Sequence, residues 1–183
     1  MKKQLAEIFV TIVSAAIVAF LIITFLFQVV SVDGRSMFPT LSDKDKLILE
    51  KASLHIIKPR RNDIVVLKYP TNPTEKLIKR VVAIEGDKIK IENDKLYINN
   101  IEISETYLND HSISDYPEVT VPSGTIFVLG DNRNNSLDSR DNRVGFVSLN
   151  LVLGRAEFRI YPFNKFGKVV NNTNDTNKVK SID

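Results

Sequence analysis

The chain contains no cysteine and only two histidines, His55 and His111. The absence of cysteine excludes disulfide bonds, thiol nucleophiles and thiolate metal sites. Neither histidine has a second histidine or a carboxylate at the spacing that helical metal ligands require, so we expect surface or loop histidines and no metal site. The cellular compartment must therefore be inferred from other features of the sequence.

The chain also has little excess charge. Its 25 Lys and Arg residues against 22 Asp and Glu residues give a formal net charge of +3 at pH 7. Without Lys2, Lys3 and Glu7 at the N-terminus, the balance of the rest is only about +2, and its basic residues are scattered. We therefore expect no nucleic acid among the partners.

One long apolar run is present, at residues 8–32, which carry no charge. As a helix rising about 1.5 Å per residue it would reach roughly 37 Å, enough to cross a hydrocarbon core of about 30 Å with some tilt. A cleaved secretory signal has an apolar stretch of only about 7–15 residues, so a permanent transmembrane anchor is the preferred interpretation. Because Lys2 and Lys3 precede the run and Asp33 follows it, residues 1–7 are expected in the cytoplasm and the rest on the outer face of the cell membrane.

After the anchor the sequence is typical of a mainly β protein. Short segments rich in Ile, Val and Leu alternate with turn-forming residues. The expected strands cover residues 45–51, 63–69, 77–84, 87–93, 95–99, 125–132 and 151–163. Residues 92–95 predict a hairpin turn and residues 99–100 a second turn, whereas residues 104–122 lack a clear period and are expected to form a loop.

This organisation predicts one folded unit behind the anchor. With 183 residues, 43% of them hydrophobic, the chain has material for one modest domain and too little for two large ones. We place a single β-rich domain at residues 33–168. Because residues 169–183 are polar, we expect them to form a disordered tail.

A serine and a lysine in separate segments could form a catalytic pair. Ser36 begins SMFPT, residues 36–40, where a serine ahead of a proline turn most often only stabilises the local backbone. A serine hydroxyl becomes a useful nucleophile when a base removes its proton, and a lysine can be that base if burial keeps it neutral. Lys79 lies among apolar residues in LIKRVVAI, residues 77–84, although a solvated strand lysine beside Arg80 is the alternative interpretation.

A third stretch, GDNRNNSLDSR at residues 130–140, follows an expected strand. It brings Ser136, Asp138 and Arg140 close together in the sequence. One interpretation is an ordinary polar turn with an Asp–Arg pair. The other is a support for a neutral lysine, in which a serine hydroxyl orients the amine and an ion pair fixes the loop.

These stretches together resemble bacterial type I signal peptidases, the membrane-bound serine proteases that remove signal peptides from exported proteins. The resemblance rests on four segments that follow the apolar run in the family's order: residues 36–40, 62–67, 79–87 and 130–147. It implies the antiparallel β catalytic domain of that family. The short separation of the last two segments, together with a single apolar run, resembles the single-span form typical of Gram-positive bacteria. The implied partners are preprotein signal peptides, as substrates, and membrane lipid.

The resemblance also implies roles for individual residues. Ser36 would be the nucleophile and Lys79 the general base of a Ser–Lys dyad that needs no metal or cofactor. Ser136 would hydrogen-bond the lysine, and Asp138 and Arg140 would form a structural ion pair.

Three further positions complete the expected site. Arg80, next to the lysine, would be structural, and Met37, next to the nucleophile, would help line the substrate cleft. The Ser36 N–H would be one donor to the oxyanion. Some relatives place a serine hydroxyl two positions before the nucleophile, where this chain has Gly34, so the second donor stays open.

Two other interpretations stay open at the level of sequence. A self-cleaving repressor-type peptidase shares the Ser–Lys dyad, but it predicts an N-terminal DNA-binding unit where this chain has its apolar run. A membrane-anchored β domain that binds partners without catalysis would have the same fold, and the intact Ser36 and Lys79 argue against it.

Overall fold

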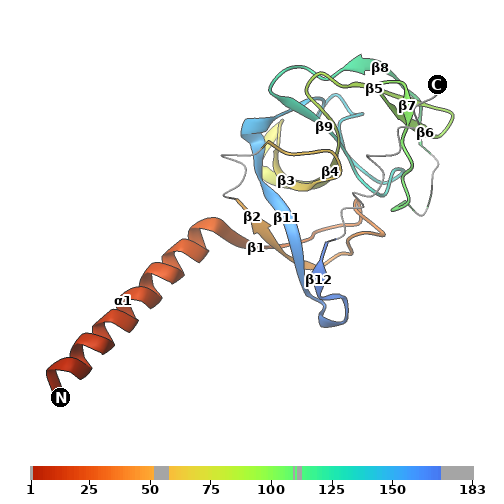
Figure 1. The fold of residues 1–183 in the computed structure, drawn as a ribbon. Helices are drawn as coiled ribbons and strands as arrows, with labels where there is room; N and C mark the ends of the chain where they lie inside the picture. The colour runs from red at the N-terminus through yellow and green to blue at the C-terminus, as the bar shows by residue number, and fades with distance from the viewer. Residues whose placement is uncertain (1, 52–57, 109, 111–112, 170–183) are drawn as a thin grey trace, which may run out of the picture.

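The structure, a computed structural model, describes residues 2–51, 58–108, 110 and 113–169. An N-terminal helix leads into a domain built of antiparallel strands (Figure 1). The strands form two sheets, which confirms the mainly β fold expected from the sequence. Residues 170–183, most of the tail expected to be disordered, lie outside the described residues.

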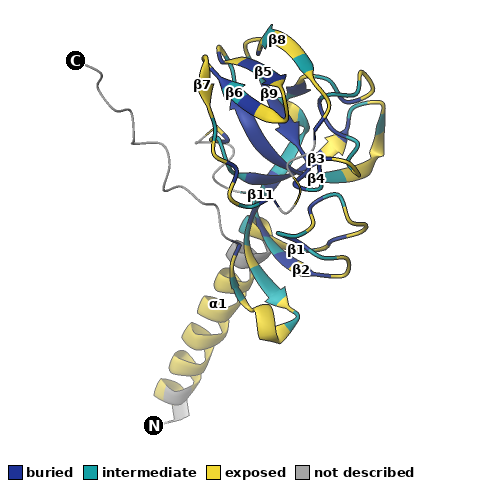
Figure 2. Ribbon diagram, turned by 90° about the vertical axis from the view of Figure 1, so that its right-hand side faces the viewer, coloured by how far each residue is buried: buried dark blue, intermediate teal, exposed yellow. Residues whose placement is uncertain are grey.

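Helix α1 (Lys2–Leu26) extends away from the β domain, and Figure 2 shows its surface as exposed. The exposed side chains include large apolar ones such as Ile8, Phe9 and Phe20. Among the residues that the structure describes, no helix is long and apolar enough to cross a membrane. The transmembrane span expected at residues 8–32 is therefore not confirmed.

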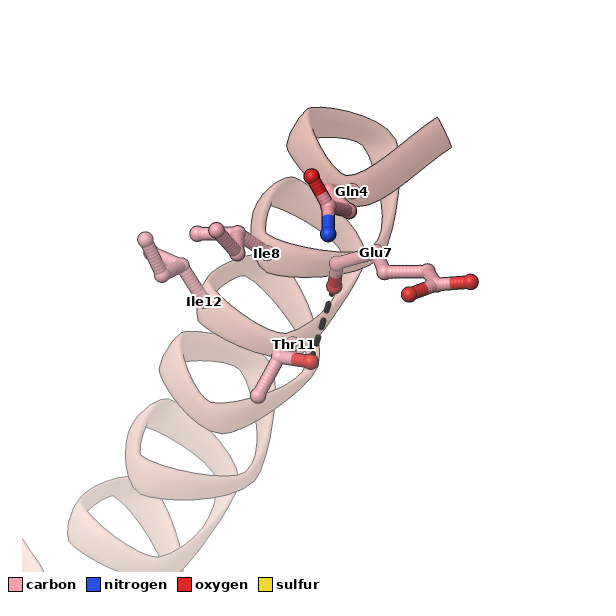
Figure 3. A pocket seen from close by; sticks show the side chains of 5 residues that line it. All are labelled: Gln4, Glu7, Ile8, Thr11 and Ile12. Carbon is pink, nitrogen blue, oxygen red and sulfur yellow. Dashed lines mark hydrogen bonds between the residues drawn. The ribbon is translucent and has the colours of Figure 1, made fainter. Parts of the chain in front are cut away.

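The first turns of α1 carry a shallow hollow (Figure 3). It is lined by Gln4, Glu7, Ile8, Thr11 and Ile12. The Thr11 hydroxyl donates a hydrogen bond to the Glu7 carbonyl oxygen at 2.8 Å. Since all five residues belong to one helix, the hollow is a gap between side chains of successive turns and carries no argument for a functional site.

The helix ends before the apolar run does, and this part of the sequence prediction is wrong. Strand β1 (Phe27–Ser31) pairs antiparallel with β2 (Lys46–Glu50). The β-branched residues Val29 and Val30 favour a strand, and the pairing satisfies backbone groups that a longer helix would have bonded internally. The β domain therefore begins with β1 rather than at residue 33.

The larger sheet contains eight of the described strands, in the order β1-β2-β11-β3-β4-β9-β10, with β12 paired to β11. Its other members are β3 (Ile64–Tyr69), β4 (Asn72–Ile84), β9 (Thr125–Leu129), β10 (Val147–Ser148), β11 (Val152–Tyr161) and β12 (Gly167–Lys168). Two short 3-10 helices, η2 (Leu149–Leu151) and η3 (Phe163–Lys165), flank β11. Strand β4 lies between β3 and β9, so the residues on its C-terminal half are buried.

The smaller sheet is a four-stranded antiparallel sheet in the order β7-β6-β5-β8. Its strands are β5 (Lys88–Glu92), β6 (Lys95–Ile98), β7 (Ile101–Glu102) and β8 (Tyr116–Thr120). Asn93 and Asp94 form the turn between β5 and β6 at φ 52° and 61°, and Asn99 and Asn100 form the next turn at φ 52° and 67°. Asn and Asp tolerate this left-handed backbone, and both expected turns are confirmed.

Strand β8 lies within residues 104–122, which the sequence predicts as a loop, and for β8 that prediction is wrong. Pro117 weakens the strand signal because proline lacks an N–H donor. However, β8 pairs with β5 at the edge of the smaller sheet, where a proline is tolerated. The seven strands expected from the sequence correspond to β2, β3, β4, β5, β6, β9 and β11.

Three clusters of buried apolar side chains hold the described domain together. The first joins the two sheets, because Phe127 and Leu129 of β9 pack with Ile89 of β5. The second lies against the larger sheet around β3 and β9. The third contains Met37 and Leu41, which anchor the loop between β1 and β2. This loop and the centre of β4 form the candidate site.

Candidate active site

Ser36 lies in the loop between β1 and β2 and is partly buried. On the same loop, the Leu41 N–H donates a hydrogen bond to the Met37 carbonyl oxygen at 2.8 Å. The Ser36 carbonyl oxygen accepts a hydrogen bond from the Asn132 N–H at 3.0 Å. Buried apolar anchors and this backbone bond therefore fix Ser36 against the segment that follows β9.

Lys79 lies on β4, opposite Val65 of β3, and only 2% of its surface is exposed. Its Nζ lies 2.7 Å from Ser36 Oγ and donates a second hydrogen bond to the Ile78 carbonyl oxygen at 3.0 Å. The structure thus brings together two residues from distant parts of the sequence. The alternative of a solvated strand lysine is contradicted by this burial.

The environment of Lys79 favours its neutral form. Burial lowers the pKa of the Lys79 ammonium from 10.5 to about 8, although the carboxylates of Asp138 and Asp131 oppose this shift. A pKa near 8 leaves an appreciable neutral fraction at neutral pH. A neutral amine at hydrogen-bond distance from a serine hydroxyl can accept the hydroxyl proton.

Ser136 reaches the same region, but not as the sequence predicts. Its Oγ is buried and has no hydrogen-bond partner among the described residues, so the expected bond to Lys79 is not formed. Gly130 lies directly beside it, since a Cβ at that position would overlap Ser136 Oγ and lie 2.5 Å from the Ser36 carbonyl oxygen. The absence of a side chain at Gly130 is what lets Ser136 approach the site.

The expected ion pair between Asp138 and Arg140 is present, with Arg140 Nε 2.8 Å from Asp138 Oδ1. Asp138 also accepts a hydrogen bond from the Gly130 N–H at 3.0 Å. The pair therefore fixes the loop at the position where Gly130 meets the serines.

Arg80 makes a second ion pair, with Asp131, that the sequence does not reveal. Arg80 Nη2 lies 2.7 Å from Asp131 Oδ2, and both side chains are fully buried. The Thr40 hydroxyl donates to the same carboxylate. Arg80 is thus held in the interior, next to Lys79, by this ion pair.

Two expected site residues lie elsewhere. Met37 is only 1% exposed and belongs to the third core cluster, so it does not line an open cleft. The Gly34 N–H donates a hydrogen bond to Asp43 Oδ1 at 2.9 Å, which occupies its backbone donor. Gly34 has φ 90°, a left-handed conformation that suits glycine.

A serine hydroxyl held against a buried, readily deprotonated lysine, on an antiparallel β domain, is the arrangement of a serine peptidase. Comparisons with known proteins agree with that class. A family model described as "Signal peptidase, peptidase S26" matches residues 5–161. The chain belongs to this family, among the bacterial type I signal peptidases, and it is a serine endopeptidase.

Individual relatives are similar along most of the chain. Signal peptidase I S of Bacillus subtilis (strain 168) is 36% identical over 178 residues, covering 91% of this chain and 95% of that protein. A signal peptidase I of Bacillus caldolyticus is 41% identical over 156 residues, covering 78% of this chain and 84% of that protein. The crystal structure of a signal peptidase I from Enterococcus faecalis V583 has 36% sequence identity and a TM-score of 0.49, and covers 55% of this chain and 97% of that one.

Proposed function

We propose that this protein removes N-terminal signal peptides from exported preproteins, with Ser36 as the nucleophile and Lys79 as the general base. The observation that supports this most directly is the 2.7 Å contact between Lys79 Nζ and Ser36 Oγ, made by a lysine that is almost fully buried. The signal peptidases to which the chain is similar support the choice of substrate.

The proposed reaction has two stages. Neutral Lys79 accepts the Ser36 hydroxyl proton while Ser36 Oγ attacks the scissile carbonyl carbon, and the resulting ammonium then protonates the leaving amine. In the second stage the neutral lysine takes a proton from water, whose oxygen attacks the carbonyl carbon of the acyl–serine. The ammonium then returns this proton to Ser36 Oγ as the acyl–oxygen bond breaks and the second product leaves. The reaction uses no metal or cofactor.

An oxyanion forms in each stage and needs hydrogen-bond donors. The Ser36 N–H is our candidate for one of them, because no described residue accepts a hydrogen bond from it. The second donor is not assigned, since the Gly34 N–H is already bound to Asp43. Ser136 would orient the lysine when substrate is bound, and the lack of another partner for its buried hydroxyl supports this role.

We further propose that α1 anchors the protein in the cell membrane, with a cytoplasmic N-terminus and the β domain on the outer face. The uncharged run at residues 8–32 and the exposed apolar side chains of α1 support contact with lipid. The basic residues before the run support the orientation. In this arrangement Ser36 lies close to the membrane surface, where a membrane-held preprotein would present its cleavage site.

The test is cleavage of a preprotein with an Ala-x-Ala site by detergent-solubilised full-length protein, with product masses determined by mass spectrometry. Wild type is expected to cut once after that site. Ser36→Ala, Lys79→Ala and Lys79→Arg are each expected to lose roughly three orders of magnitude in kcat. The first removes the nucleophile and the second removes the base. The third keeps the positive charge, but a guanidinium cannot serve as the neutral base.

Lys76→Ala is the matched control, because Lys76 is an exposed lysine on the same strand. It should retain wild-type activity. Cleavage by Lys79→Arg at a substantial rate would refute the role of the lysine. A folded wild-type protein that leaves the preprotein intact would instead indicate a β domain that binds without catalysis.

A further inference from the structure

A buried ion pair that the proposed reaction does not use lies behind the site. Arg133, on the loop after β9, has a fully buried side chain. Its Nη1 and Nη2 donate hydrogen bonds to the two carboxylate oxygens of Glu105, at 2.8 Å and 2.5 Å. Glu105 lies between β7 and β8 and is only 7% exposed, so the segment that joins these strands places a charge in the interior, beside the loop after β9.

Tyr107 extends this contact to the residue next to the lysine. Its hydroxyl donates a hydrogen bond to Glu105 Oε1 at 2.6 Å. Its ring centre lies 3.9 Å from the guanidinium carbon of Arg80, a cation–π contact. The segment around Glu105 therefore touches both Arg133 and Arg80.

Arg133 is in turn tied to the backbone of the catalytic loop. Its Nε donates a hydrogen bond to the Gly130 carbonyl oxygen at 3.0 Å, and its own carbonyl oxygen accepts one from Arg140 Nη2 at 2.7 Å. Gly130 is the residue that packs against the Ser36 carbonyl group. Arg133 is thus linked through Gly130 to the backbone of Ser36.

Three ion pairs near Lys79 join six charged groups, which we name the arginine–carboxylate cluster. They come from β4, from the loop after β9 and from the segment between β7 and β8. The members are Arg80, Arg133, Arg140, Asp131, Asp138 and Glu105. Three guanidinium groups thus balance three carboxylates, so the cluster and Lys79 together are neutral only when Lys79 is neutral. Interior regions of low dielectric disfavour net charge.

We propose that Glu105 is a positioning residue of the reaction, which neutralises Arg133 and thereby sets the electric field in which Lys79 acts as the base. The proposal rests on the function proposed above. Asp131 carries the coupling, because its carboxylate interacts with Lys79, with Arg80 and with Arg133. When Glu105 is lost, Arg133 becomes an uncompensated cation that competes for Asp131.

The two partners of the ion pair predict opposite effects on the lysine. An uncompensated Arg133 cation disfavours the ammonium form, so Glu105→Gln should lower the pKa of Lys79. An uncompensated Glu105 carboxylate favours the ammonium form, so Arg133→Gln should raise it. A merely structural role would loosen the interior in both variants, admit water, and raise the pKa of Lys79 in both towards 10.5.

The experiment is an NMR titration of the full-length protein in detergent, with lysine labelled with 13C at Cε. The Lys79 signal is assigned by its loss in Lys79→Ala. The midpoint is expected to fall by about half a unit or more in Glu105→Gln and to rise by a similar amount in Arg133→Gln. The double variant, with the charge balance restored, should titrate near wild type.

Tyr107→Phe is the matched control, because it removes a hydrogen bond to Glu105 and changes no charge at neutral pH. Its midpoint should stay at the wild-type value. The lower-pH limb of kcat/KM should move in the same directions as the NMR midpoints.

Upward shifts in both single variants, or no shift in either, would overturn the proposal. If Glu105→Gln alone does not fold, the double variant decides, since a structural role predicts a large upward shift there. The NMR midpoint does not depend on cleavage. A wild-type protein that titrates as expected but cuts nothing would therefore remove the proposed function and leave the electrostatic coupling in place.

Discussion

Burial of Lys79 has a measurable consequence for stability. The pKa of Lys79 is about 8 in the folded chain against 10.5 for an exposed lysine. The unfolded chain therefore holds the extra proton between these pH values, and this group adds stability as pH rises through that window. Below pH 8 both states are protonated, and burying the ammonium costs roughly 3 kcal/mol.

Lys79→Met should for this reason be more stable than wild type at pH 7. The expected gain is up to about 3 kcal/mol, and it should shrink as the pH is raised from 8 towards 10.5. Thermal unfolding followed by circular dichroism in one detergent, at pH 7 and pH 10, measures both parts. Lys76→Met, at an exposed position on the same strand, is the control and should show no such pH dependence. An equal gain at both pH values would mean that packing, and not charge, is responsible.

The environment of an individual residue could be predicted from the sequence only where its neighbours along the chain indicate that environment. Ser36 lies beside apolar residues in a proline-containing turn, and Lys79 lies among the apolar residues of a predicted buried strand. Glu105 has no such signal, because its segment lacks a period and its partner Arg133 is brought to it by the packing of two sheets. For Met37 the sequence predicts a place in the substrate cleft, because it adjoins Ser36, whereas its apolar side chain is buried in the core.

Among the elements, strands with alternating or apolar runs were predictable, and edges and boundaries were not. The end of α1 could not be found from the charge pattern, because β1 continues the uncharged run that begins in the helix. Strand β8 contains a proline and mostly exposed residues, so only its pairing with β5 makes it a strand. The strand propensity of a short segment does not indicate whether it pairs with a distant part of the chain.

Strand β11 depends on a close approach at one position. A Cβ at Gly154 would lie 2.7 Å from the Glu50 carbonyl oxygen and 2.5 Å from Leu49 Cγ, both on β2. Gly154→Ala should therefore destabilise the domain by roughly 3 kcal/mol, because backbone atoms of a paired strand cannot move aside cheaply. Chemical denaturation gives this value directly.

Gly86→Ala provides the comparison for that experiment. Gly86 has open space around it but φ 83°, so alanine there should cost only about 1 kcal/mol, from backbone strain. A Gly154→Ala variant no less stable than Gly86→Ala would show that β11 can shift away from β2.

On the scale of the whole domain, the two sheets share one core. Phe127 and Leu129 of β9 are buried by residues of the smaller sheet, including Ile91. Ile91→Ala should therefore accelerate amide hydrogen exchange in β4 and β9 as well as in β5, corresponding to a loss of about 3 kcal/mol. Lys88→Ala, exposed on the same strand, should leave exchange unchanged. Faster exchange confined to the smaller sheet would mean that it opens alone.

The direct junction between α1 and β1 fixes the distance between the end of the helix and the start of the loop that carries Ser36. No loop residue separates the helix from the strand, and β1 is paired with β2 along its whole length. Five residues at about 3.3 Å each form a spacer of roughly 17 Å that can neither stretch nor fold back. This spacer between the end of the helix and the loop that carries Ser36 is therefore built into the sheet. Under the proposed function, a preprotein must bring its cleavage site to the distance from the helix that this spacer sets.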